Sequence, residues 1–234
     1  MRTTVLLTLF FIHAQSFGMA QKMDWDKAVD NAVYRYGLRT EPELKRFFEH
    51  ANVAYPPSDI ALLAFKKEKN IELWAKDDGT KSWHFIHTYP LTAYSGHLGP
   101  KLKAGDRQIP EGVYQLTSFN PYSSMHLSIM VNYPNNFDRS HAAKDGRREL
   151  GGDIFLHGKS LSVGCLAVGD YAIDQLFLLA RRVGLSHTKL IIAPNDLRKD
   201  RPATLTLTQP GWLNSLYQQI TQALGEFHTK KHIS

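Results

Sequence analysis

The chain of 234 residues has an ordinary globular composition, with 43% hydrophobic and 21% charged residues, which excludes a disordered or fibrous protein. The formal net charge is +6, and a basic surface either suits an anionic partner such as a carboxylate-rich polymer or simply aids solubility. The sequence shows neither zinc-finger spacing nor alternation of aromatic and basic residues, so we expect no nucleic-acid partner.

Residues 1–20 have the layout of a secretory signal peptide. An arginine precedes an apolar run over 5–12, and small residues at Gly18 and Ala20 flank a plausible cut. The run is shorter than the roughly 20 residues that span a bilayer. We therefore expect export to the periplasm and a mature chain without a transmembrane segment. The alternative is a buried N-terminal helix.

Residues 21–57 are predicted to be helical. Apolar residues recur at three- and four-residue steps from Met23 onward, as they do on one face of a helix. Thr40 as a cap, with Pro42 near a first turn, predicts that a second helix begins there. We expect these helices to pack on the core rather than to cover a groove.

Short apolar or alternating runs separated by turn residues then predict strands over 60–65, 71–75, 83–87, 112–117, 126–131 and 154–156. A helix is expected from Asp170, as its cap, to Gly184, followed by strands over 189–193 and 203–208 and a last helix over 212–227. The predicted fold is mostly β, a sandwich or open barrel with flanking helices at both ends. Residues 58–200 form its main domain, and residues 201–234 add a C-terminal strand and helix.

The single cysteine, Cys165, has no partner for an intramolecular disulfide. His157 lies shortly before it at the end of an apolar strand, and an imidazole can activate a thiol as a nucleophile. Gly158 and Gly164 permit tight turns, and backbone amides near Cys165 could face a developing oxyanion. From the residues alone, a catalytic thiol and an inert core cysteine remain alternatives.

The pattern His157-Gly158 followed by Ser162-Val163-Gly164-Cys165 resembles the active-site signature of the L,D-transpeptidase (YkuD-type) catalytic domain. The resemblance covers about residues 60 to 195. The stretch 99–107 and the residues around Asn132-Tyr133-Pro134 are most similar to the YafK-like subgroup of that family.

The resemblance implies that Cys165 is the nucleophile and His157 its base, oriented by the main-chain carbonyl of Gly158. Amides of Gly164 and Cys165 would form the oxyanion hole. It also implies peptidoglycan stem peptides as partners, without metal or cofactor. The thiol would attack the L-centre carbonyl of the third stem residue, diaminopimelate, to give a thioester acyl-enzyme.

The sequence departs from the family pattern at two positions. Val163 replaces the histidine of Ser-His-Gly-Cys, and Leu166 stands where an arginine often follows the cysteine. The substrate carboxylate would therefore need another cation, for which the candidates are Arg139, Lys101 and Lys159. Ser162 and Tyr133 are further candidates for the substrate groove.

Three acyl acceptors remain open. An amine would give transpeptidation, a protein lysine would attach that protein, and water would give L,D-carboxypeptidase activity or release a protein linked to peptidoglycan. A non-catalytic wall-binding module is the alternative of another class, favoured by Val163. His84 and His87, three residues apart on a predicted strand, face opposite sides, so we expect no metal site there.

Overall fold

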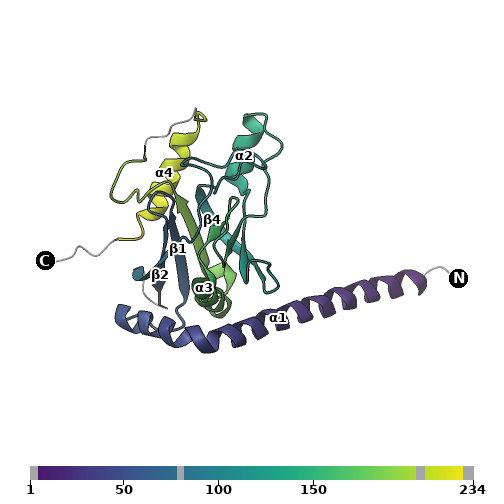
Figure 1. Ribbon diagram of the computed structural model, residues 1–234. Helices are drawn as coiled ribbons and strands as arrows, with labels where there is room; N and C mark the ends of the chain where they lie inside the picture. The colour runs from purple at the N-terminus through teal and green to yellow at the C-terminus, as the bar shows by residue number, and fades with distance from the viewer. Residues whose placement is uncertain (1–4, 78–81, 204–208, 229–234) are drawn as a thin grey trace.

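The computed structural model describes residues 5–77, 82–203 and 209–228, with only the course of the backbone for 5–23. A mixed sheet, curled into a half-barrel, forms the centre of the structure (Figure 1). It has eight strands in the order β3-β2-β1-β8-β4-β5-β6-β7. The strands are β1 (Asp59–Phe65), β2 (Asn70–Lys76), β3 (His84–Pro90), β4 (Gly112–Asn120), β5 (Ser128–Val131), β6 (Phe155–His157), β7 (Leu166–Ala167) and β8 (Thr188–Ala193). The predicted mostly-β fold with helices at both ends is confirmed.

The central strands are buried on both faces. β1 pairs antiparallel with β2 and parallel with β8, and both β1 and β8 are nearly continuous apolar runs, as expected for strands covered on two sides. Ile60 and Leu62 point into the larger core cluster, whereas Ala61 and Leu63 point into the cluster beneath α4 (Leu213–Leu224). Alternation along a strand thus distributes one segment between two cores.

The N-terminal helix α1 (Val5–Ala51) is continuous, so the prediction of a second helix beginning at Thr40 is wrong. The hydroxyl of Thr40 donates to Tyr36 O (3.0 Å) within the helix instead of capping a new one. Pro42 in a helix interior costs about 3 kcal/mol. Burial of Leu44 and Phe48, both 0% exposed, offsets that cost.

α1 packs on α3 (Asp170–Val183) and on β3. Within the described residues, no helix is both long and apolar enough to cross a membrane. The signal peptide and its removal stay predictions.

The remaining helices close the structure. The predicted helix from Asp170 to Gly184 corresponds to α3, with Gly184 at its C-terminal cap, and the last predicted helix corresponds to α4. A short helix, α2 (Asn136–Lys144), and a 3-10 turn, η1 (Leu185–His187), complete the elements. The strand predicted over 203–208 lies outside the described residues from 204 onward.

Candidate active site

His157 is the last residue of β6, and its ring is fixed by the residue that follows. Its Nδ1 lies 2.6 Å from the carbonyl oxygen of Gly158. A carbonyl can only accept, so Nδ1 carries the proton and Nε2 presents a lone pair. His157 is 3% exposed, and its neighbours Ser128 and Leu156 belong to paired strands of the same sheet. The side chain is therefore a preoriented acceptor for a proton.

Gly158 is required by close packing. A Cβ at this position would lie 2.7 Å from Asp170 Oδ1 and 2.8 Å from Met125 O. The sequence predicted Asp170 as the N-terminal cap of α3, and this is wrong, because Gly169 occupies the cap position. The carboxylate of Asp170 instead accepts the Lys159 amide at 2.7 Å. It thereby ties the turn after His157 to the start of α3.

Cys165 immediately precedes β7 and is half-buried. Its thiol donates to the carbonyl oxygen of Asp153 at 3.6 Å, while the hydroxyl of Ser162 donates to Cys165 O at 2.8 Å and closes the loop before it. Cys165 and His157 both line one cavity of about 290 Å³. In the described part of the chain no hydrogen bond joins the two side chains directly.

The electrostatics favour an uncharged pair at rest. Burial raises the pKa of the Cys165 thiol; the charge of Asp153 adds to this, while the Phe155 backbone N–H and Lys101 oppose it. Burial also lowers the pKa of His157, against the opposing effect of the Gly158 carbonyl. Near neutral pH the pair is therefore a thiol and a neutral imidazole rather than a thiolate and an imidazolium.

The expected oxyanion donors differ in availability. The Gly164 amide donates to Ser95 Oγ at 2.7 Å. Gly164 has φ +108°, and a Cβ there would lie 3.1 Å from Gln108 O, so only glycine suits the position. Among the described residues, none accepts the Cys165 amide. That N–H remains the available donor beside the thiol.

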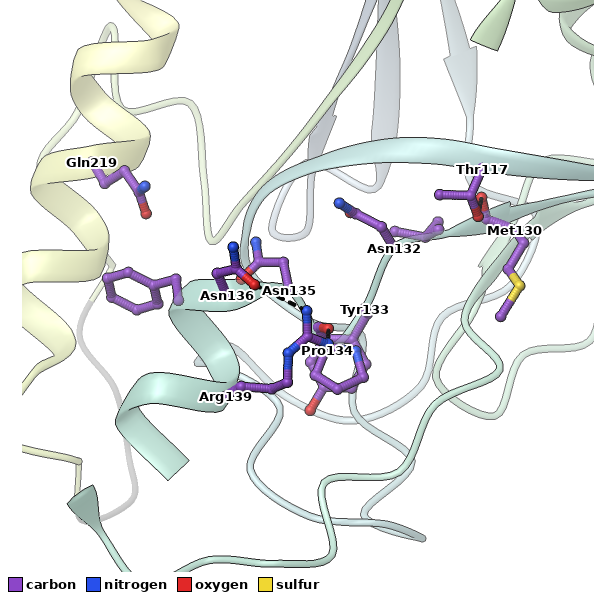
Figure 2. A pocket seen from close by; sticks show the side chains of 11 residues that line it. Thr117, Met130, Asn132, Tyr133, Pro134, Asn135, Asn136, Arg139 and Gln219 are labelled. Atoms are coloured by element: carbon purple, nitrogen blue, oxygen red, sulfur yellow. Dashed lines mark hydrogen bonds between the residues drawn. The ribbon is translucent and has the colours of Figure 1, made fainter. Parts of the chain in front are cut away.

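The residues predicted to bind the substrate carboxylate do not line the cavity with Cys165. Arg139 folds back in a different cavity, where its guanidinium donates to Pro134 O and Asn136 Oδ1 (Figure 2). Tyr133 is 4% exposed and donates to Leu150 O, as a packing residue does. Lys101 is buried and lies 2.5 Å from Asp106.

Lys159, the third cation proposed from the sequence, is tied to the opposite wall. Its ammonium donates to Ser124 O at 2.6 Å. The described lining of this cavity therefore contains no Asp, Glu, Lys or Arg side chain. It consists of Asn120, Ser123, Ser124, Met125, Ser128, Phe155, His157, Leu161, Val163 and Cys165.

Several functional contacts were missed by sequence reasoning. Ser95, 69 residues before Gly164, and the carbonyl of Asp153, 12 residues before Cys165, both contact the loop that carries Cys165. The wall at Ser123–Met125 is supported by His126, which lies 2.7 Å from Asp174, and Asp174 in turn pairs with Arg39 of α1 at 2.7 Å. No local pattern reports such contacts, because they join loops that only the fold brings together.

The chain matches the model of the YkuD family, the L,D-transpeptidase catalytic domain, over residues 59–192. It belongs to this family. The matched range includes the cavity, His157 and Cys165.

Individual proteins similar to this chain share at most about a third of its residues over the aligned part. YafK of Escherichia coli (strain K12), provisionally named an L,D-transpeptidase, is 32% identical over 122 residues, which cover 51% of this chain and 46% of YafK. The match thus spans about half the length of the relative. The helical cell shape determining protein Pgp2 of Campylobacter jejuni aligns with TM-score 0.48 at 20% identity, over 64% of this chain and 52% of Pgp2. Bd1075 of Bdellovibrio bacteriovorus aligns with TM-score 0.42 at 23% identity, over 61% of this chain and 50% of Bd1075.

Proposed function

We propose that the protein is an exported cysteine enzyme that remodels peptidoglycan through a thioester acyl-enzyme. One observation carries the proposal: the Nδ1 proton of His157 is donated to Gly158 O, which leaves Nε2 as the proton acceptor of a residue that lines the same cavity as the lone thiol. Family membership supplies the substrate class, stem peptides of peptidoglycan. The diaminopimelate carbonyl of the third residue is the proposed target.

In the first half-reaction the thiol proton moves from Cys165 to Nε2 of His157 as the sulfur attacks the carbonyl carbon. For this the thiol must turn away from Asp153 O toward the imidazole. The negative charge that develops on the carbonyl oxygen is stabilised by the Cys165 amide. One such donor contributes about 3 kcal/mol. Cleavage of the C–N bond releases the amine, which takes the proton from His157.

In the second half-reaction an acceptor amine or water loses a proton to Nε2 and attacks the thioester carbon. The C–S bond breaks, and the departing sulfur regains a proton from the imidazolium. An amine acceptor gives a cross-link or an attached protein, and water gives a shortened stem or a released protein. Of these we favour transpeptidation, with hydrolysis at the same site as the alternative.

The resting state distinguishes this mechanism from one with a preformed ion pair. Because the pKa of the thiol is raised and that of the imidazole lowered, proton transfer accompanies attack instead of preceding it. A substrate that fills the cavity would remove water and strengthen the new Cys165–His157 hydrogen bond.

The test is incubation of the protein with purified sacculi, followed by mass spectrometry of the muropeptides. New cross-links, shortened stems or a released protein would each identify one acceptor. Cys165→Ala should lose all turnover while its circular dichroism spectrum is unchanged, with exposed Ser160→Ala as the matched control. Retained turnover in Cys165→Ala refutes the mechanism. Binding to sacculi without turnover in the wild type would instead support the wall-binding module.

A further inference from the structure

A second cavity, of about 510 Å³, is lined by residues of β4, β5, α2 and α4 and of the segment that joins β5 to α2. In the regular pairing of β5 with β6, Ser128 opposes His157 and Met130 opposes Phe155. Residues two apart on a strand share a face. Ser128, His157 and Phe155 line the cavity with Cys165, whereas Met130 lines the second one. The side chains of Met130 and Phe155 therefore form the boundary between two adjoining spaces.

The geometry along β5 sets the distance between the two sites. At about 3.3 Å per residue, Met130 lies about 7 Å and Asn132 about 13 Å along the chain from Ser128, which is next to His157. Met130, in the lining of the second cavity, is thus about two extended residues from the position beside His157. Its volume falls in the range of ordinary ligand pockets, about 300–1,000 Å³.

The lining of the second cavity is rich in amides and carries one cation, Arg139. Figure 2 shows Asn132, Asn135, Asn136 and Gln219 gathered around one space between β5, α2 and α4. Asn135 is fully used, because it caps α2 and donates to Val113 O. The other three differ: Asn132 and Asn136 use only their oxygens, for the Gln115 amide and for Arg139, and Gln219 is exposed.

Three amide groups therefore offer N–H donors for which the described residues supply no acceptor. The one cation in the lining, Arg139, is committed to Pro134 O and Asn136. Because donors outnumber free acceptors here, a site of this kind suits a ligand rich in acceptor oxygens. The hydroxyl and acetamido oxygens of an N-acetylated amino sugar have this chemistry.

We propose that the second cavity binds the glycan strand to which the reacting stem peptide is attached. The inference rests on the proposed function of the Cys165 site. A stem that reacts at its third residue places its sugar attachment about three residues away, which is about 10 Å at roughly 3.5 Å per extended residue. That length lies between the about 7 Å and about 13 Å by which Met130 and Asn132 follow Ser128 along the chain.

The experiment compares turnover of a free stem peptide with turnover of the same peptide attached to a short glycan chain. The wild type should prefer the glycan-bearing substrate by about tenfold in kcat/KM, equivalent to about 1.4 kcal/mol. Asn132→Asp, which keeps the acceptor for Gln115, and Gln219→Ala should each remove most of this preference. Turnover of the free peptide should stay unchanged. Gln218→Ala, an exposed neighbour outside the cavity, is the matched control.

Equal turnover of both substrates by the wild type would overturn the proposal, as would a preference that survives in both variants. A preference for sugar-free cross-linked stems over a single stem would assign the cavity to a second peptide and also overturn it. Binding of peptide-free glycan chains to Cys165→Ala separates the two hypotheses. If that binding is weakened by Gln219→Ala while the wild type turns over nothing, the glycan site stands and the proposed function fails.

Discussion

Replacing Lys66 by Met should destabilise the fold and loosen the loop that packs against Gly164. Lys66 is fully buried, and its ammonium donates to Glu111 (2.9 Å), Gly99 O (2.8 Å) and Ile109 O (2.9 Å), which uses all three protons. Its two carbonyl partners, Gly99 and Ile109, are the first and last residues of the 99–109 loop. That loop carries Gln108, whose carbonyl lies against Gly164.

The magnitude follows from the charge that the substitution leaves behind. In Lys66→Met the Glu111 carboxylate stays buried, with the Gly99 amide and the Tyr217 hydroxyl as its remaining donors. Breaking a buried pair in this way costs about 3–5 kcal/mol. With a urea m-value of about 2 kcal/mol/M, the unfolding midpoint should fall by about 2 M. Lys66→Met/Glu111→Gln should recover part of the loss, because the unpaired group is then neutral.

Urea unfolding followed by circular dichroism measures the change. The matched control is Lys189→Met, which removes a half-exposed pair with Glu226 and should cost less than about 1 kcal/mol. Two results would refute the reasoning: a loss in Lys66→Met no larger than in the control, or a double variant at least as unstable as Lys66→Met.

Three further predictions concern the site and its surroundings. Because the pKa of Cys165 is raised, alkylation of the free enzyme by iodoacetamide should show an apparent pKa above that of a free thiol. Because the pKa of His157 is lowered, kcat/KM should already be at its plateau near pH 7. Rapid alkylation at pH 6 would contradict the first expectation. Gly158→Ala should reduce kcat at least about tenfold with the fold retained, since its Cβ would contact Asp170 and displace the carbonyl that orients the imidazole; wild-type kcat would exclude this role. Burial raises the pKa of Asp138 to about 6, so the stability gained from its protonation is complete below the unfolded pKa near 4 and is lost as pH rises through 6. Between pH 4.5 and 7.5 the unfolding free energy of the wild type should therefore fall by about 2 kcal/mol from this group, and Asp138→Asn should remove that fall. An equal fall in the variant would exclude Asp138 as its source.

The fold was predictable wherever a local pattern determines it. The strands containing Ile60–Phe65 and Lys189–Ala193 are apolar runs that can only be buried, and both are found in the sheet. The break predicted at Thr40 failed because burial of Leu44 and Phe48 outweighs a local proline signal. The prediction of Asp170 as a cap was also wrong because of a tertiary contact: its carboxylate accepts a hydrogen bond from the Lys159 amide.

The site was predictable only in part. His157-Gly158 and Cys165 lie in one short motif, and the structure places both side chains on one cavity. Arg139 and Lys101 are predicted from their charge to bind the substrate carboxylate. In the structure they instead donate to nearby acceptors, Asn136 and Asp106. Charge along a sequence cannot report which cavity a side chain enters.

The substitution of Val163 for histidine limits the number of bases at the site. Val163 is 64% exposed at the rim of the cavity, where an imidazole could otherwise have assisted the acceptor. In the described lining, His157 and Cys165 are the titratable groups. The proposed reaction, with its two half-reactions, therefore needs one imidazole to accept a proton twice and to return it twice. Its pKa must be low enough to leave it neutral at the start of each half-reaction, which is the direction in which burial shifts it.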